Sequence, residues 1–203
     1  MAYIFAALVG YLLGCSNMAW YLARAKGVDL TSGGSGNPGA SNATILMGWK
    51  AGIAVGAHDI GKAIVAVLLV RLFFPDLASI AEIAGVACVL GHIFPVFLKF
   101  QGGKGFASYI GMMIALNWKA AIVILIGVVV ITVITDYIVC GTTWTVLSLP
   151  AWTAFSTHAW VSVLILCVAT AVILYRHRQN YVRIFRRTEI GLRSTIQGKH
   201  RVT

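Results

Sequence analysis

Residues 2–23 of this 203-residue chain read AYIFAALVGYLLGCSNMAWYLA and contain no Asp, Glu, Lys or Arg. An uncharged apolar stretch of about 20 residues is long enough to cross the hydrocarbon core of a bilayer as an α-helix. Arg24 and Lys26 end the stretch. Because no basic segment precedes it and it has the length of a span, we expect a membrane-spanning helix here rather than a cleavable signal peptide.

The composition of the whole chain favours the same class of protein. Hydrophobic residues make up 59% of it and charged residues only 11%, whereas about a quarter of the residues in a soluble domain are charged. We therefore predict an all-α, polytopic membrane protein. The four cysteines are scattered through apolar segments without metal-ligand spacing, so we expect buried thiols, no disulfide and no metal site.

The formal net charge of +10 makes nucleic acid a candidate partner. However, the chain has no basic amphipathic helix and no aromatic RNA-binding platform. Its charges lie between the apolar segments, as topology signals do. We expect membrane lipids around the protein and no nucleic-acid partner.

Further apolar segments cover residues 51–70, 77–98, 106–116, 120–135 and 137–175. Residues 106–116 and 120–135 are short for spans, so these helices are expected to tilt or to begin inside their flanking loops. Residues 137–175 carry no Asp, Glu, Lys or Arg and are too long for one crossing. They predict two helices, the second at residues 159–175. The total is about seven transmembrane helices.

The basic residues predict how the helices are oriented. With about seven crossings and the amino terminus outside, the loops at residues 24–50, 99–105, 136–143 and 176–203 share the cytoplasmic side. Thirteen of the sixteen Lys and Arg residues lie in these loops, as the positive-inside rule requires. The carboxyl terminus is then cytoplasmic.

Three stretches rich in glycine or in hydrogen-bond donors fall on that side: GGSGNPGASN at residues 33–42, QGGKG at 101–105 and YRHRQN at 175–180. Glycine lets a backbone fold tightly and approach a ligand closely. Successive N–H groups can then form an anion-binding concavity, with Ser and Asn side chains as extra donors. None of the stretches is a nucleotide P-loop, which needs Lys followed by Ser or Thr. They predict a site for an anionic substrate at the cytoplasmic surface, built from Ser35, Gly36, Asn37, Lys104, His177 and Asn180.

Each stretch also has a plainer interpretation. A Gly/Ser run is typical of a flexible connector. Residues 176–187 are also typical of the solvated basic flank of a span, in contact with anionic lipid. His177 and Asn180 are spaced i, i+3 and would share a face of a helix. We favour a site there because the other two loops are expected to converge on it.

Asp59 and Lys62 lie within the second span. Charges at that depth cost a few kcal/mol unless they are paired, so the i, i+3 spacing predicts a salt bridge. The alternative is the proton or ion relay of a transporter, which we disfavour because no partners on other helices stand out. His92, just before Phe94 and Pro95, is expected to be a hydrogen-bonding residue at a helix end rather than a ligand.

The residues resemble those of a known family, the bacterial acyl-phosphate-dependent glycerol-3-phosphate acyltransferases. Its three motifs are matched by GSGNPGASN at residues 34–42, GHIFPVFLKFQGGKG at 91–105 and RHRQN at 176–180. Asp59 and Lys62 also match a pair in its second helix. The resemblance covers nearly the whole chain. It implies seven helices in the bacterial cell membrane and a site that faces the cytosol.

The resemblance also implies a reaction. Its members transfer a fatty acyl group from acyl-phosphate to the 1-hydroxyl of glycerol 3-phosphate, giving lysophosphatidic acid and phosphate for phospholipid biosynthesis. Neither CoA nor acyl carrier protein is the donor, and no cofactor is implied. We expect direct transfer without an acyl-enzyme, because a mixed anhydride is already activated and the protein need only position the hydroxyl and stabilise developing charge.

The resemblance assigns roles to particular residues. Ser35, Lys104, His177 and Asn180 would be catalytic, with Lys104 neutralising phosphate. The residues that would bind substrate or phosphate are Gly36, Asn37, Gly39, Ser41, Asn42, Gly102, Gly103 and Thr142. Asp59 and Lys62 would be a structural pair. Residues 1–185 would form one transmembrane acyltransferase domain, followed by a basic cytoplasmic tail at 186–203.

The chain departs from the family pattern at several positions. Ile45 stands where the family has an Arg implicated in holding the substrate phosphate, and residues 136–139 read DYIV in place of RYVS. A site Ser is Thr142, and the Glu of the third motif is Gln179. Losing one charge-assisted bond costs about 1.5–3 kcal/mol, or roughly ten- to hundredfold in acceptor affinity.

These departures leave other functions open. One is acylation of another small polyol or phosphorylated acceptor. Another is a non-catalytic membrane scaffold, and a third is an anion transporter. A transporter should show internal repeats or broken helices at matching positions in two halves, and the sequence shows no such repeat.

Overall fold

The computed structural model describes residues 1–34 and 36–196. All regular secondary structure in this part of the chain is helical, which confirms the all-α prediction. The chain divides into two compact units, residues 1–117 and the remainder from Trp118. Each unit is described by itself.

The helices of the described residues account for every apolar segment expected from the sequence. Five segments are long and apolar enough to cross a membrane: α1 with α2 (Ala2–Cys15, Met18–Lys26), α4 (Trp49–Phe73), α5 with the 3-10 turn η1 (Ile80–Ile93, Val96–Leu98), α7 (Trp118–Thr135) and α8 (Ile138–Thr157). A sixth is the pair α9 (Trp160–Arg176) and α10 (Arg178–Phe185), bent by 46° at their junction. The shorter α6 (Phe106–Leu116) has 11 residues, and α3 (Ala40–Met47) and α11 (Leu192–Ile196) complete the described helices.

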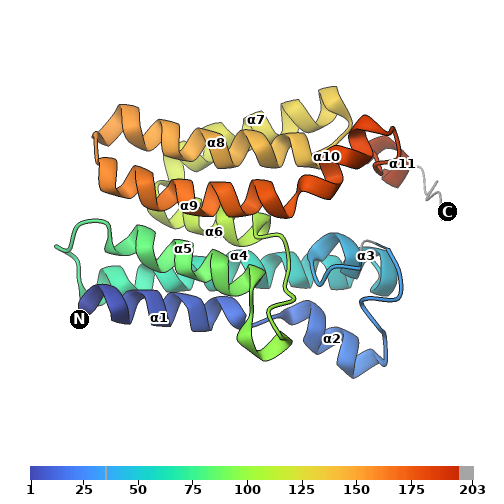
Figure 1. Ribbon diagram of the computed structural model, residues 1–203, viewed down its shortest axis with the longest axis horizontal. Coiled ribbons are helices and arrows are strands. Elements are labelled where there is room, and N and C mark those ends of the chain that lie inside the picture. The colour runs from blue at the N-terminus through green and yellow to red at the C-terminus, as the bar shows by residue number, and fades with distance from the viewer. Residues whose placement is uncertain (35, 197–203) are drawn as a thin grey trace. The chain divides into compact units, whose positions relative to one another are not determined.

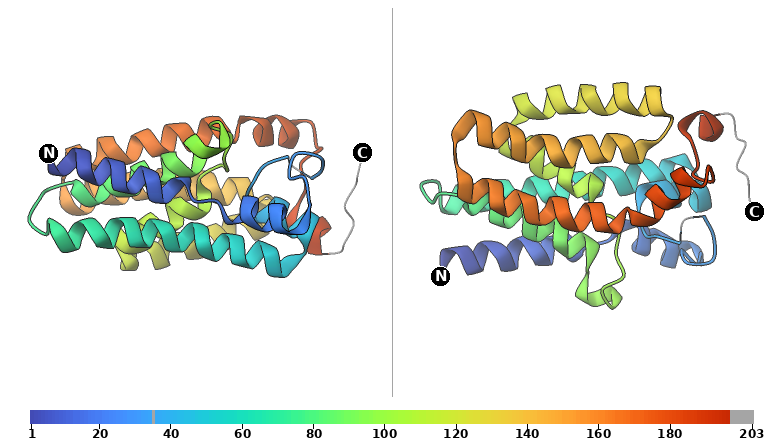
Figure 2. Two further views of the ribbon diagram at one scale, coloured as in Figure 1. Left: turned by 90° about the horizontal axis from the view of Figure 1, so that it is seen from below. Right: turned by 45° about the horizontal axis from the view of Figure 1, so that its top comes forward.

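In the first unit, α1 packs along α5, and α4 packs against both α5 and α6 (Figures 1 and 2). Glycines allow this close approach. A Cβ at Gly10 or Gly14 would overlap the carbonyl oxygen of Ala84 or Cys88 on α5, and one at Gly111 on α6 would overlap that of Ile60 on α4. Gly10 and Gly14 are spaced i, i+4, the small-residue pattern with which membrane helices bring their backbones together.

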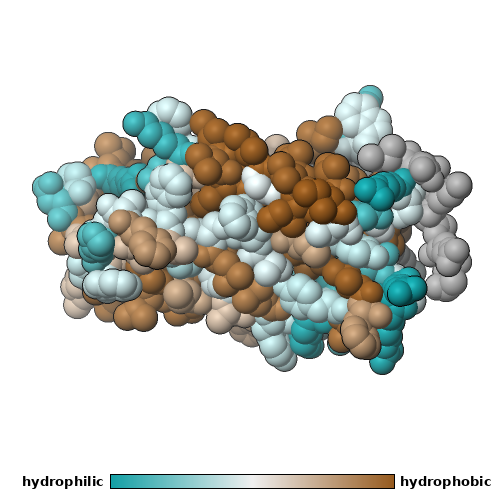
Figure 3. All heavy atoms as spheres, turned by 90° about the horizontal axis from the view of Figure 1, so that it is seen from above, coloured by the Kyte–Doolittle hydropathy of each residue, from teal (hydrophilic) through white to brown (hydrophobic). Residues whose placement is uncertain are grey.

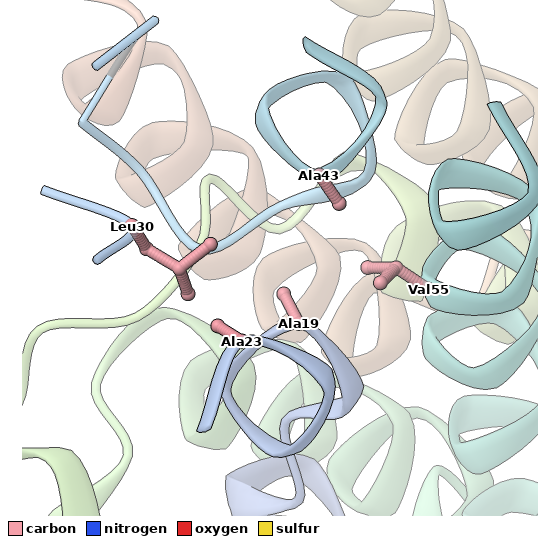
Figure 4. Packing of buried hydrophobic residues seen from close by; sticks show 5 residues of the cluster. All are labelled: Ala19, Ala23, Leu30, Ala43 and Val55. Atoms are coloured by element: carbon pink, nitrogen blue, oxygen red, sulfur yellow. The ribbon is translucent and has the colours of Figure 1, made fainter. Parts of the chain in front are cut away.

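The first span is broken at Ser16 and Asn17, a break that the uncharged run of residues 2–23 does not reveal. The side chain of Asn17 accepts a hydrogen bond from the N–H of Trp20 at 2.9 Å and so caps the start of α2. Beyond the break, α2 packs against α3 and α4, and the cluster of mostly small buried side chains there (Figure 4) consists of Ala19 and Ala23 of α2, Leu30 of the following loop, Ala43 of α3 and Val55 of α4. The break therefore turns α2 toward the loop that leads to α3.

The direction of the helices places both glycine-rich loops at one end of the first unit. α1 and α5 end there, and α4 and α6 begin there (Figure 1). Basic residues lie at the same end, in α2, at the start of α4 and in the loop after α5. At the opposite end Arg71, in the last turn of α4, donates hydrogen bonds to the carbonyls of Ala115 and Leu116 at 2.6 and 3.3 Å.

In the second unit, α7 packs against α8, and α8 against α9. Two side chains tie these helices to one another. The indole N–H of Trp144 on α8 donates to the carbonyl of Ile124 on α7 at 3.1 Å, and the hydroxyl of Thr170 on α9 donates to the carbonyl of Val146 at 2.7 Å. In hydrocarbon such bonds are valuable because no water is present to satisfy polar groups.

Large apolar side chains remain exposed along the helices. Those of α7 are Trp118, Ile122, Val123, Ile126, Val129, Val130, Val133 and Ile134. On the face shown in Figure 3, hydrophobic residues gather in the middle and hydrophilic ones lie toward the ends. An apolar surface of this kind is unfavourable in water and favourable in contact with lipid chains.

Candidate functional site

The first glycine-rich loop is built on a backbone that only glycine adopts readily. Gly34 and Gly36 have φ values of +60° and +64°, in the left-handed region that side chains disfavour. The N–H of Gly36 donates to the carbonyl of Gly33 at 3.1 Å, which closes a tight turn. Ser35, the expected catalytic serine, lies outside the described residues.

The loop ends at the start of α3. Gly39 is the N-cap residue, and no side chain caps the helix there. The first N–H groups of a helix lack partners within the helix and carry partial positive charge, so such an end suits an anion. Ser41 is exposed in this first turn. The predicted binding residues Gly39 and Ser41 therefore lie at this helix N-terminus, and their role in phosphate binding stays a prediction.

Asn42 was expected to bind substrate or phosphate, and its side chain lies inside the loop. Its side chain is buried, with 1% exposed, and its Nδ2 donates to the carbonyl of Leu30 at 2.9 Å. A Cβ at Gly34 would overlap its Oδ1. Asn42 thus holds the loop together from inside, which is a structural role that residue type alone did not indicate.

The loop is also anchored where it begins. The carboxylate of Asp29 accepts hydrogen bonds from the N–H and the hydroxyl of Thr31 at 2.8 and 2.7 Å. These bonds favour the charged carboxylate and hold the pKa of Asp29 below its usual value.

The second glycine-rich loop folds back onto the end of α5. The N–H groups of Gly102 and Gly103 donate to the carbonyls of Ile93 and His92, each at 3.1 Å. Both glycines are buried, and a Cβ at Gly103 would overlap the imidazole of His92. Their N–H groups were expected to contribute to phosphate binding, but they are committed to the loop itself. These two glycines shape the loop by packing against α5.

Lys104 follows these buried glycines and is half-buried rather than fully exposed. Gly105, at φ +93°, is the N-cap residue of α6, and again no side chain caps the helix. Both glycine-rich loops of the first unit therefore lead into helix N-termini capped only by glycine. The second loop adds a cation beside one of them.

The predicted salt bridge of the second span is confirmed. Lys62 Nζ lies 2.8 Å from Asp59 Oδ1, and both side chains are buried. The contacts of this pair with residues outside α4 were not predicted from the sequence. His92 Nδ1 on α5 lies 3.3 Å from Asp59 Oδ1 and 3.0 Å from Lys62 Nζ, and Lys62 also donates to the carbonyl of Ser16 at 2.7 Å.

A further histidine extends this network at the break between α1 and α2. His58 Nε2 lies 3.0 Å from the Ser16 hydroxyl, and its Nδ1 lies 3.5 Å from Asp59 Oδ1. The pair thus connects α4 to α5 and to the break between α1 and α2 instead of standing alone in α4. Because His92 belongs both to this network and to the wall behind Gly103, the buried charges support the loop that carries Lys104.

The remaining site residues lie in the second unit. His177 is buried at the bend between α9 and α10, and its Nδ1 lies 2.9 Å from the carbonyl of Ile173. A carbonyl only accepts, so Nδ1 carries a proton, and in the neutral ring Nε2 is then the acceptor atom. Asn180, also buried, donates from Nδ2 to Glu189 Oε1 at 2.6 Å.

Thr142 lies in the first turns of α8, and its hydroxyl donates to the carbonyl of Ile138 at 3.1 Å within the same helix. Its neighbour Thr143 contacts the Tyr181 hydroxyl on α10 at 2.7 Å. The start of α8 is therefore held beside the helix that carries Asn180.

Comparison with known proteins identifies the family. The sequence matches the family model described as glycerol-3-phosphate acyltransferase over residues 4–187. The chain belongs to this family. It is 32% identical to glycerol-3-phosphate acyltransferase 1 of Oceanobacillus iheyensis, over 96% of this chain and 97% of that protein. It is 36% identical to the glycerol-3-phosphate acyltransferase of Thermoanaerobacter pseudethanolicus, over 93% and 95%.

Solved structures of the family have the same fold. One is PlsY (YgiH), an integral membrane glycerol 3-phosphate acyltransferase, in its glycerol 3-phosphate form. It has a TM-score of 0.89 and 30% sequence identity, over 96% of this chain and 98% of that one. The lysophosphatidic acid form has a TM-score of 0.85 at the same identity. Like these relatives, this glycerol-3-phosphate acyltransferase family member is an integral membrane protein.

Proposed function

We propose that the protein transfers a fatty acyl group from acyl-phosphate to the 1-hydroxyl of glycerol 3-phosphate, with lysophosphatidic acid and phosphate as products. The observation that carries the proposal is the family match over residues 4–187, which spans all three motifs. The solved relatives support both ends of the reaction, because one is a glycerol 3-phosphate form and the other a lysophosphatidic acid form.

In this reaction the first unit handles phosphate. Helices α3 and α6 each begin with a glycine N-cap, at the same end of the unit. Each helix N-terminus offers N–H groups to an anion. Lys104 supplies the compact positive charge that a leaving phosphate needs. The Asp59–Lys62–His92 network keeps the second loop in place, so the donors are preset before charge develops.

The second unit handles the acceptor. His177 presents Nε2 as a hydrogen-bond acceptor because Nδ1 is turned to the carbonyl of Ile173. It can therefore accept a hydrogen bond from the attacking hydroxyl, while Asn180 positions substrate beside it. The carbonyl of a mixed anhydride is already activated, so the hydroxyl attacks it directly without a covalent acyl-enzyme. The acyl–phosphate bond breaks, and the hydroxyl proton passes to the departing phosphate.

We further propose that the protein lies in the bacterial cell membrane with its amino terminus outside and its carboxyl terminus in the cytosol. The positions of the cations in the first unit support this orientation. The glycine-rich end carries Arg24, Lys26, Lys50, Lys99 and Lys104, and the opposite end carries Arg71. The positive-inside rule assigns the more basic end to the cytoplasm.

The test is turnover by purified protein in lipid nanodiscs supplied with acyl-phosphate and glycerol 3-phosphate. We expect release of inorganic phosphate that requires the acceptor, with lysophosphatidic acid formed in equal amount. Lys104→Ala should lower kcat/KM by about tenfold or more, the equivalent of one charge-assisted bond. Lys104→Arg should restore only part of it, since a planar fork differs from a compact ammonium.

Lys99→Ala is the matched control, because Lys99 is an exposed lysine of the same loop. Its activity should equal that of the wild type. Acyl-phosphate binding without turnover on any phosphorylated polyol would instead indicate a non-catalytic scaffold. Anion flux across proteoliposomes without acyl transfer would indicate a transporter.

A further inference from the structure

We propose that the exposed face of α10 binds the headgroups of anionic phospholipids in the bilayer, and that this contact holds His177 and Asn180, on the buried face, in their working position. The link to activity rests on the proposed function, in which these two residues contact substrate. The sequence of residues 176–187 is typical both of a site and of a basic flank in contact with lipid. The two interpretations then apply to two faces of one helix.

The two faces of α10 differ in burial and in composition. His177, the N-cap residue, and Asn180 are buried and lie three residues apart, on one side of the helix. On the other side apolar and basic side chains are exposed at the i, i+4, i+7 spacing of a single face, and Phe185 is 90% exposed. This outer face consists of Arg178, Val182, Phe185 and Arg186.

Helix α10 begins where an apolar helix ends. It bends away from α9 by 46° at their junction (Figure 1), which the proposed orientation places at the cytoplasmic surface of the membrane. A short helix with apolar side chains and cations on its exposed side is typical of helices that lie in the headgroup region of a bilayer. The outer face therefore meets a layer that contains anionic headgroups.

The cations of the outer face are not neutralised by the protein. Arg183, which lies between the two faces, is paired with Glu189. Among the described residues, no acidic side chain forms an ion pair with Arg178, Arg186 or Arg187. Three positive charges beside an exposed Phe side chain complement an anionic lipid surface and not a zwitterionic one.

Arg178 is held at this surface by its neighbour. Its guanidinium lies over the exposed ring of Tyr175, 4.3 Å from the ring centroid, and its Nη1 donates to the Tyr175 carbonyl at 3.2 Å. Tyr side chains are enriched at the level of the headgroups. A guanidinium has five N–H donors in a fork that fits a phosphate, so donors remain for a lipid. The Tyr175–Arg178 pair thus presents a positioned cation where lipid phosphates lie.

The lipid contact bears on the reaction because both faces belong to one short helix. On its protein side α10 is held by the junction with α9 and by the contact of the Tyr181 hydroxyl with Thr143 on α8, at 2.7 Å. Headgroups on the exposed side add a second support, which stabilises the bend and with it the positions of His177 and Asn180. Anionic lipid then promotes acyl transfer without touching the substrates.

Photo-crosslinking tests the contact itself on the full-length protein in nanodiscs. With p-benzoylphenylalanine in place of Phe185, in a mixture with about a quarter anionic phospholipid, the anionic lipid should be captured roughly three- to fivefold above its share. The matched control is the same substitution at Phe155, which is 84% exposed near the end of α8 remote from α10. Capture there should follow the composition of the bilayer.

Steady-state kinetics test the consequence for catalysis. At saturating substrates, kcat of the wild type should be roughly three- to tenfold higher in the mixed nanodiscs than in purely zwitterionic ones. Saturation removes the effect of surface charge on the local concentration of an anionic acceptor. Phe185→Ser, and the double variant Arg186→Gln with Arg187→Gln, should lose most of this stimulation and match the wild type in zwitterionic lipid.

Lys119→Gln is the charge-matched control, because it removes an exposed cation from the other end of the second unit, at the start of α7. It should retain the full stimulation. The proposal is overturned if the lipid captured at position 185 has the bulk composition, if a second copy of the chain is captured instead, or if the outer-face variants respond to anionic lipid as Lys119→Gln does. A wild type without acyl transfer in either lipid would overturn the proposed function, whereas the capture at 185 would still decide the lipid contact.

Discussion

Gly34 and Gly36 of the first loop are exposed and have positive φ, whereas Gly102 and Gly103 of the second loop are buried against α5. A Cβ at Gly36 would meet nothing closer than 3.9 Å, but one at Gly103 would overlap the His92 ring. Gly36 of the first loop is needed for its dihedral freedom, whereas Gly103 of the second loop is needed for its lack of a side chain. Gly34 combines both needs, because its φ is positive and a Cβ there would overlap Asn42 Oδ1. Similar composition thus serves two different physical needs.

This difference bears on how each loop meets a ligand. An exposed turn with space around it can adjust its N–H groups when an anion arrives. The second loop has a network of buried charges behind it and carries its cation at a fixed position. The second loop therefore holds Lys104 rigidly, where charge must be neutralised in the transition state. The first loop can adapt to the ligand.

The largest expected effect is that of Gly103→Ala. The added methyl must displace the His92 ring, which contacts Asp59 and Lys62. Overpacking of this kind costs about 1–3 kcal/mol of stability, and a displaced Lys104 should lower kcat by roughly a hundredfold. Steady-state kinetics and thermal unfolding in detergent measure both changes.

Gly61→Ala is the control for this variant, because a Cβ there meets no atom within 4 Å. It should leave both kinetics and unfolding temperature unchanged. If Gly103→Ala behaves like Gly61→Ala, the second loop does not depend on its contact with His92.

Gly36→Ala should have a smaller effect. The new Cβ has space, but the left-handed conformation at φ +64° costs a residue other than glycine about 1–2 kcal/mol. An exposed turn can relax part of this strain, so we expect a three- to tenfold rise in a substrate KM, roughly that energy expressed as affinity. Gly36→Asn should lie between Ala and wild type, since Asn tolerates this region better. A loss as large as that of Gly103→Ala would remove the distinction between the loops.

The features that could be predicted from the sequence are those that depend on residues close together in the chain. Uncharged runs predicted the helices, and the i, i+3 spacing of Asp59 and Lys62 predicted their salt bridge. Glycine content predicted tight turns, and Gly34 and Gly36 have the positive φ that such turns need. In each case the decisive interaction lies within a few residues of the chain.

Contacts between distant segments were not predictable in the same way. His92 joins Asp59 across 33 positions of sequence, and nothing in the surrounding residues indicates which helix its ring meets. Asn42 was expected in the site because it matches the family's first motif, and the sequence did not indicate that its amide donates back to the carbonyl of Leu30. The residues around Glu189 have the basic composition expected of a cytoplasmic tail. Only the folded turn after α10 brings Glu189 to Asn180.

The smallest expected effect concerns Ile45, which lies beside the first glycine-rich loop. Ile45 lies on α3 with 40% of its surface exposed, and its Cγ2 would be 3.5 Å from a Cβ at Gly34. It therefore borders the adaptable loop, at the position where the family has a cation. Ile45→Arg should lower the KM for glycerol 3-phosphate by roughly three- to tenfold and leave the KM for acyl-phosphate unchanged, the pattern of added uniform binding.

Ile45→Met, which keeps the position apolar, separates the effect of charge from that of side-chain shape and should match the wild type. An acceptor without a phosphate would reverse the result for Ile45→Arg. Activity on that acceptor would fall because an apolar contact is replaced by a charge, while activity on glycerol 3-phosphate would rise. We expect the first outcome, because the other positions of the first motif are retained and Lys50, at the start of α4, offers another cation at this end of the unit. Equal kinetics of Ile45→Arg and wild type on both acceptors would show that α3 does not reach the acceptor.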